Sequence, residues 1–258
     1  LQPQIIDEFV RAAHANAENV NVEGLSKIVR GFLSNVPFTN IMMLARPRRA
    51  PTYEEIVHDV TTFVGGPCGH INPVLNEVLI YLGFDSSLVP AWMNGSMSHI
   101  ALIVRIGSDN YWVDCGNGHP YFSPIKIGST SSYTHAGLTY RIVNTGSRYR
   151  VQHRLSQRSS YEDNYEFELL RVPFSFFHEM VESHYLDTEF GPFLGGLRLV
   201  TFPNGEMTAI RDMELLMTED GVLSKVTLDN RSELLETISL YFPRATEFLP
   251  EALEVLRW

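Results

Sequence analysis

Cys68 is the side chain with the clearest chemical use, because it follows two glycines and lies where a helix is expected to begin. Residues 65–67, Gly-Gly-Pro, end one helical segment, and a new apolar run covers residues 74–82. Unpaired N–H groups and the helix dipole at such a start favour the thiolate, which is the nucleophilic form of cysteine. Gly66 would allow a substrate to approach the backbone closely. The alternative is that Cys68 is a small buried apolar residue, as free cysteines often are.

A cysteine nucleophile needs a base, and the base needs an acceptor that orients it. His99 opens an expected strand, and Asp114 ends the next one. If the hairpin turns symmetrically about residues 107–110, His99 lies opposite Gly118 and Asp114 lies opposite Ile103, so that both point to one face. They would then be about 13 Å apart, and contact requires a slipped register, an asymmetric turn or a bulge. Each residue alone also fits a structural role, in the core or as a cap of the following turn.

The elements that must position these residues are expected in the order helices, then strands, then a mixed segment. Helical spacing of apolar residues predicts helices in the first 84 residues, with Asn21 as a cap of the second one. Pro73 predicts that the helix after Cys68 either begins near Asn72 or has a distorted first turn. Further helices are expected over residues 53–64, 74–82, 234–241 and 249–255, and strands over 99–106, 111–115, 140–143, 149–153, 165–170, 197–203 and 206–211.

Composition excludes several classes of protein. The 258 residues are 44% hydrophobic, which is ordinary for a globular protein and rules out global disorder. Thirty acidic and twenty basic residues give a net charge of −10, which argues against nucleic-acid binding and against adhesion to an anionic membrane. No apolar run approaches the ~18 residues of a membrane span. Two cysteines and the lack of a signal peptide favour a cytoplasmic setting, although the sequence does not show whether a targeting segment was trimmed before Leu1.

Several motifs together, each weak alone, resemble those of the arylamine N-acetyltransferase family. Val36-Pro37-Phe38-x-Asn40 is similar to the family's "IPFEN" segment, and residues 190–205 resemble its late "HPxSPF" segment and the Thr and Asn-Gly that follow. The match spans most of the chain in the right order. The motifs that carry the chemistry are Gly65-Gly66-x-Cys68-x-x-x-Asn72, Ser98-His99 followed by five apolar residues, and Val113-Asp114-x-Gly116-x-Gly118.

The resemblance implies an α+β fold with a cysteine-protease-like core. A helical bundle over residues 1–84 would carry Cys68, an antiparallel β-barrel over 85–190 would carry His99 and Asp114, and an α/β lid would cover 191–258. It also implies a Cys-His-Asp triad and ping-pong acyl transfer through a cysteine thioester. The implied donor is acetyl-CoA, the implied acceptor is an arylamine or hydrazine, and no bound cofactor is needed.

Departures from the family pattern surround the nucleophile. The family motif begins Arg-Gly-Gly and continues Cys-x-Glu, whereas this chain has Val64 and His70, so an ion pair has been replaced as a unit. Thr39 stands where Glu is usual, and Cys115 and Asn117 stand where apolar residues are common. These changes argue against acetylation of simple arylamines more strongly than they argue against acyl transfer as such. They fit either a larger acyl donor, as in amide formation during natural-product assembly, or neutral drift around an acetyl pocket.

Further residues are expected to shape the site around the triad. His70 is an alternative base, but positions two apart at a helix start diverge in direction, so His99 is preferred. Backbone N–H groups around Cys68 and Cys115 are expected to stabilise an oxyanion. The site-shaping residues are Gly66, His70, Asn72, Cys115 and Gly116.

The remaining candidates have weaker patterns. Arg46-Pro47-Arg48-Arg49 is interpreted as a solvated loop, with contact to a CoA phosphate or an acidic carrier protein as the alternative. No metal site is expected, because His178-Glu179 lacks a second histidine at helical spacing and neither cysteine has a C-x-x-C partner.

Three functions therefore stay open. The first is an acyltransferase that moves an acyl group from CoA, or from a carrier-protein thioester, to a small amine. The second is a thiol hydrolase or transglutaminase-like enzyme with the same triad, and the third is a non-catalytic binding protein on this scaffold. The complete triad favours catalysis, but the sequence determines neither the acyl group, nor the acceptor, nor the oligomeric state.

Overall fold

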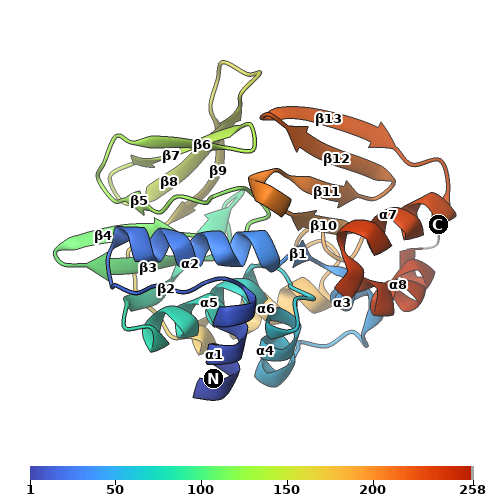
Figure 1. Cartoon of the computed structure of the whole chain (residues 1–258), viewed down its shortest axis with the longest axis horizontal. Coiled ribbons are helices and arrows are strands. Elements are labelled where there is room, and N and C mark those ends of the chain that lie inside the picture. Colours follow the sequence, from blue (N-terminus) through green and yellow to red (C-terminus); the bar gives the residue numbers. More distant parts are fainter. Residues whose placement is uncertain (257–258) are drawn as a thin grey trace.

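Packed helices form the N-terminal part of the chain in a computed structural model that describes residues 1–256 (Figure 1). Asn21 caps α2, as predicted, by accepting a hydrogen bond from the Gly24 N–H at 2.8 Å. Except for the short helix over residues 41–45, the apolar faces of these helices share one core with buried residues of the neighbouring sheet. The helices are α1 (Pro3–Ala12), α2 (Val22–Asn35), α3 (Ile41–Ala45), α4 (Tyr53–Thr61) and α5 (Cys68–Tyr81).

The central part is an eight-stranded antiparallel sheet that curls into a nearly closed barrel (Figure 1). Its spatial order is β5-β4-β3-β2-β9-β8-β7-β6. Trp112 on β4 contacts both Tyr140 on β7 and Tyr165 on β9, so side chains from well-separated strands meet inside the barrel. The strands are β2 (Asp85–Met93), β3 (Ser96–Ile106), β4 (Asp109–Val113), β5 (Ile125–Lys126), β6 (Ser132–His135), β7 (Leu138–Asn144), β8 (Tyr149–Leu155) and β9 (Glu162–Phe167).

The C-terminal part is a five-stranded antiparallel sheet beside the barrel, covered by helices that pack on one core (Figure 1). The short η1 (Phe174–Phe177) and α6 (His178–Leu186) connect the barrel to this sheet. The edge strand β1 (Phe38–Thr39) comes from the N-terminal segment and pairs with β10. The other elements are β10 (Arg198–Thr201), η2 (Pro203–Gly205), β11 (Thr208–Arg211), β12 (Glu214–Glu219), β13 (Val222–Thr227), α7 (Arg231–Tyr241), η3 (Pro243–Phe248) and α8 (Leu249–Leu256).

The helical, barrel and mixed zones confirm the predicted α+β class, while the boundaries 1–84, 85–190 and 191–258 stay a prediction. The crossing of β1 into the C-terminal sheet ties the first segment to the last. None of the helices within residues 1–256 has the length and apolar composition to cross a membrane.

The hairpin of β3 and β4 is tighter than expected. Its ladder leaves only residues 107–108 in the loop, so the symmetric turn over 107–110 is wrong. A two-residue loop shifts the register by two positions, which keeps His99 and Asp114 on one face because side chains alternate. The shift also halves their expected separation along the strands to about 7 Å.

Helix α5 begins at Cys68 and contains Pro73 as its sixth residue. Of the two alternatives that Pro73 leaves open, the start near Asn72 is therefore excluded, and the helix includes the proline. A proline at this position removes one backbone hydrogen bond of the second turn. The helix continues through it because α5 is buried along most of its length and packs against β2 and β3. The early start places Cys68 at the first position of the helix.

Candidate active site

Cys68 lies at the N-terminus of α5 and is 3% exposed. Its N-cap is Pro67, whose side chain cannot accept a hydrogen bond from the first turn. The N–H groups of Cys68 and Gly69 consequently have no acceptor within residues 1–256. These donors, together with the helix dipole, place positive potential beside the sulfur.

The loop after β4 lies directly against this helix start. A Cβ atom on Gly116 would be 2.6 Å from the Cα of Cys68, so only glycine allows this approach. Gly66 has a similar role, since a Cβ there would overlap the side chain of His70. Gly116 thus borders Cys68, and Gly66 borders His70.

His99 on β3 is buried, and its ring contacts Asp114. Its Nε2 lies 2.7 Å from Oδ2 of Asp114. Because a carboxylate only accepts, Nε2 carries the proton of the neutral ring, and Nδ1 is free to take the thiol proton. Burial lowers the pKa of His99, but the charges of Asp114 and of a Cys68 thiolate outweigh it and raise the pKa above 6.5.

Asp114 is fully buried and accepts four hydrogen bonds. Oδ1 accepts from Nδ2 of Asn72 and from the Gly116 N–H, both at 2.9 Å. Oδ2 accepts from His99 and from the Tyr165 hydroxyl, both at 2.7 Å. Every lone-pair direction of the carboxylate is therefore used, and its position is determined by four separate elements.

Asn72 makes two further hydrogen bonds around Asp114. Its Nδ2 also donates to the carbonyl of Ile100 at 2.7 Å, and its Oδ1 accepts from the Cys115 N–H at 3.1 Å. The second bond corrects one expectation: the Cys115 N–H is occupied and does not stabilise an oxyanion. Of the two places named, only the α5 start keeps free backbone donors.

Tyr165 on β9 was missed by the sequence reasoning. Its ring packs on the His99 ring at 4.6 Å between centroids, and its hydroxyl accepts from Nε1 of Trp112 at 2.9 Å. From the sequence, an inward-facing tyrosine in a strand is predicted only to be a buried core residue. Only the order of strands in the barrel, which places β9 across from β3 and β4, identifies it as a neighbour of the triad.

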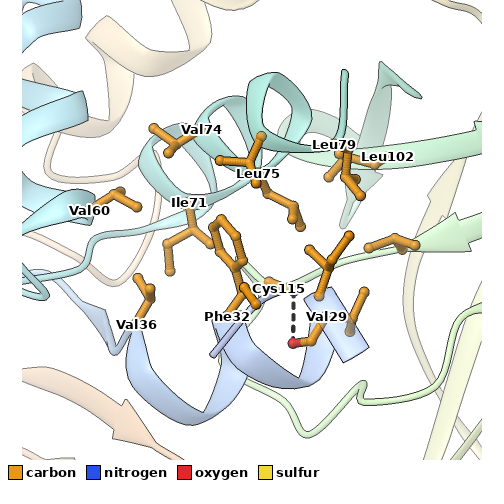
Figure 2. Close-up of a cluster of buried hydrophobic side chains, with 14 of the residues drawn as sticks. Val29, Phe32, Val36, Val60, Ile71, Val74, Leu75, Leu79, Leu102 and Cys115 are labelled. Atoms are coloured by element: carbon orange, nitrogen blue, oxygen red, sulfur yellow. Dashed lines mark hydrogen bonds between the residues drawn. The ribbon is translucent and has the colours of Figure 1, made fainter. Parts of the chain in front are cut away.

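Cys115 is a packed core residue rather than a second reactive thiol. Figure 2 shows it between α2 and α5, among Val29, Phe32, Ile71 and Leu75. The thiol lies 3.9 Å from the carbonyl of Val29. Burial, followed by the charge of Asp114, raises its pKa well above 9.0, so the thiol stays protonated.

A sequence model of N-acetyltransferases matches residues 21–244 of the chain. The chain belongs to the arylamine N-acetyltransferase family. The Mycobacterium marinum arylamine N-acetyltransferase, solved in complex with CoA, superposes with a TM-score of 0.86 over 97% of this chain and 98% of that one. Their sequences are 17% identical, so this likeness shows the shared fold alone.

Two curated relatives are more similar in sequence over shorter segments. The pineal gland arylamine N-acetyltransferase of Gallus gallus is 26% identical over 174 residues, which cover 62% of this chain and 58% of that protein. Proansamycin X synthase of Amycolatopsis mediterranei is 26% identical over 149 residues, which cover 52% of this chain and 56% of that protein. The chain therefore spans little more than half the length of these relatives.

The replaced ion pair of the arylamine N-acetyltransferase motif has a counterpart nearby. Val64 is buried in an apolar cluster that includes Tyr185. Arg46 and the buried Asp59 form a bidentate pair with both N–O distances at 2.7 Å. Asp59 in turn lies 3.6 Å from Nε2 of His70. The chain thus supplies a charged pair from other positions of the helical bundle.

His70 is buried and contacts Tyr185. Its Nε2 lies 3.1 Å from the Tyr185 hydroxyl, while its Nδ1 is buried without a partner within residues 1–256. Burial, with the charge of Arg46, lowers the pKa of His70 to about 3. Its neutral ring therefore packs beside Tyr185 at the first turn of α5.

The basic cluster is mostly committed to internal pairs. Arg46 pairs with Asp59, and Arg49 pairs with Glu55 at 2.5 Å. Only Arg48 has no ion-pair partner within residues 1–256. This leaves little free charge for a CoA phosphate or a carrier protein at this loop.

The low pKa of His70 predicts acid sensitivity. Unfolded His70 binds a proton near pH 6.5 but folded His70 does so only near pH 3, so the unfolded state binds more protons in between. The contribution of the neutral His70 ring to the free energy of unfolding is therefore fully present above pH 6.5 and is lost as the pH falls toward 3. Between about pH 6.5 and about pH 5 this one residue costs about 2 kcal/mol of the free energy of unfolding.

Urea unfolding at both pH values measures this term. His70→Gln should reduce the pH-dependent loss by about 2 kcal/mol, whereas His58→Gln, at an exposed position of α4, should leave it unchanged. An equal loss in the wild type and in His70→Gln would contradict the assignment.

Proposed function

We propose that the protein is an acyltransferase that moves an acyl group, acetyl in the simplest case, from a CoA thioester to a small amine. Cys68 is the nucleophile, His99 the base and Asp114 the residue that orients it. The observation that carries the proposal is the buried His99–Asp114 bond of 2.7 Å beside a thiol at a helix start. Membership of the arylamine N-acetyltransferase family supports it.

In the first half-reaction, Nδ1 of His99 takes the thiol proton and the Cys68 sulfur attacks the thioester carbonyl. The bond to the sulfur of CoA breaks, and that sulfur leaves with the proton from His99. The acyl group then resides on Cys68 as a new thioester. The free N–H groups of Cys68 and Gly69 are placed to stabilise the oxyanion of the tetrahedral intermediate.

In the second half-reaction, the amine nitrogen attacks the acyl carbon of the thioester on Cys68. The C–S bond breaks, the amine gives one proton to His99, and an amide leaves the site. Asp114 stabilises the imidazolium in both steps. The burial of Cys68 and His99, each 3% exposed, limits competing hydrolysis and favours transfer over a hydrolase reaction.

Intact mass spectrometry after incubation with acyl-CoAs of increasing chain length tests the proposal. One acyl group should be added to the protein, and adding an amine should remove it with formation of an amide. Release as the free carboxylic acid at the same rate with and without amine would identify a hydrolase. No adduct from any donor would overturn the proposed function.

A second candidate keeps this mechanism with a larger acyl donor. Polar side chains continue from His99: its Nε2 lies 3.5 Å from Nδ2 of Asn117, and Asn117 accepts from Asn164 at 2.8 Å. Asn164 also donates to Tyr121 at 2.7 Å. Polar groups beside the reaction centre suit a functionalised substrate, and similarity to Proansamycin X synthase is in keeping with this. A tenfold or greater preference, in kcat/KM, for acetyl-CoA with a simple arylamine would exclude it.

The donor identity thus decides between the two candidates. A carrier protein as donor and a cytoplasmic setting stay predictions.

A further inference from the structure

His184 lies on α6, which packs against the turn of α5 that carries Cys68. A Cβ atom on Gly69, the residue after Cys68, would lie 3.1 Å from Cγ2 of Val181. His184 follows Val181 by three residues, so the two share one face of α6. That face is turned toward the start of α5.

The imidazole of His184 is a buried polar group that the triad does not use. It is 5% exposed, and within residues 1–256 its ring makes no hydrogen bond. The rings of Phe190 and Phe193 flank it at 4.9 Å and 5.0 Å between centroids. An imidazole in such apolar surroundings gains free energy when a partner from outside the chain hydrogen-bonds to it.

The aromatic rings beside His184 continue toward the loop that follows β4. The ring of Phe193 lies 6.0 Å from that of Phe38, and a Cβ atom on Gly118 would be 3.3 Å from the Phe38 ring. Gly118 belongs to the loop that follows β4 and lies against α5. Burial lowers the pKa of His184 to about 4, and the charge of His99 lowers it too. At neutral pH the His184 ring is therefore uncharged and keeps one lone pair to accept a hydrogen bond.

The loop that carries the two phenylalanines is held in place. Nδ2 of Asn40 donates to the carbonyl of Phe193 at 2.6 Å and to that of Gly196 at 2.7 Å. Its Oδ1 accepts from the Arg198 N–H at 2.8 Å. The loop around Phe193 is thus held in position before a substrate arrives, which reduces the entropy lost on binding.

We infer that His184 binds the acceptor: its neutral imidazole accepts a hydrogen bond from an N–H of an amine whose apolar part packs on Phe190 and Phe193. The inference rests on the proposed function and concerns only its second half-reaction, because the amine enters after Cys68 has been acylated. The hydrogen bond directs the nitrogen lone pair toward the acyl carbon. Proton transfer stays with His99, so His184 neither gains nor loses a proton over the cycle.

Loading and transfer can be measured separately. 4-Nitrophenyl acetate loads Cys68 without any need for CoA recognition, and the burst of nitrophenolate reports this step. 4-Methoxyaniline then removes the acetyl group. In His184→Phe, loading and hydrolysis by water should stay within about twofold of wild type, while aminolysis should fall at least about tenfold, the worth of one hydrogen bond.

Two variants complete the design. His184→Gln retains a hydrogen-bond acceptor and should recover part of the aminolysis rate, and it also serves if the phenylalanine variant fails to fold. His178→Phe, at an exposed position of the same helix, should match wild type in both steps.

The outcomes separate the two proposals. Unchanged aminolysis in His184→Phe, or an equal fall in loading and aminolysis, would overturn the role of His184 in binding the acceptor. A wild-type protein that never loads would overturn the proposed function itself, and the role of His184 with it.

Discussion

Cys68→Ala is expected to abolish acyl transfer and to leave the fold intact. The substitution removes the only sulfur at the free N–H groups of α5, and no other nucleophile replaces it. Cys115, the second cysteine, is buried in the core with a pKa raised by burial and by Asp114. The transfer rate should fall at least about 10⁴-fold, as for other covalent nucleophiles.

The measurement is the acyl adduct in an intact mass spectrum, together with the rate of amide formation. Far-ultraviolet circular dichroism checks the fold. Cys115→Ala is the matched control and should keep the adduct, with a loss of stability from the smaller core side chain. An adduct that persists in Cys68→Ala, or that disappears in Cys115→Ala, would show that the nucleophile has been assigned to the wrong cysteine.

Asp114→Asn should reduce acylation by about 10⁴-fold, the size found when the carboxylate of such a triad is replaced. The wild-type carboxylate accepts from four donors. Whichever way the new amide turns, its NH₂ group faces two of them. When the NH₂ group faces His99, it favours the imidazole tautomer whose proton lies on Nδ1. In that tautomer Nδ1 cannot accept the thiol proton. A donor facing a donor also costs about 1–3 kcal/mol of stability, so a lower melting temperature should accompany the loss.

Tyr165→Phe is the matched control, because it removes one of the four donors and keeps the acceptor of His99. Its acylation rate should fall only about tenfold. Burst kinetics with an activated ester measures both variants. An Asp114→Asn protein that acylates as fast as Tyr165→Phe would show that Asp114 is structural and that another group orients His99.

Local sequence patterns predicted much of the site. Two glycines and a proline before Cys68 mark a helix start without a side-chain cap, and the structure shows that start at Cys68. Strand alternation put His99 and Asp114 on one face, and their side chains meet at 2.7 Å. These features depend on neighbouring residues and on a period of two, so a single sequence contains them.

The errors arose where a contact depends on register or on competition for a donor. The loop between β3 and β4 holds two residues rather than four, which the run of four turn-forming residues did not distinguish. Pro73 allows either a helix start near Asn72 or a distorted first turn, and the packing of α5, which outweighs the lost hydrogen bond, decides for the start at Cys68. The Cys115 N–H was a plausible oxyanion donor until the structure showed Asn72 accepting its bond.

The sequence by itself determined the fold class, the family resemblance and the three residues of the proposed triad. Each rests on short motifs, on alternation or on the order of helical and strand segments, which are properties of the local chain. Only the tertiary structure decided that Tyr165 completes the shell of Asp114 and that Arg46 and Asp59 supply a charged pair beside His70. These partners are 11 to 51 residues apart in the chain, and their contacts follow from strand order and helix packing, which no local pattern specifies.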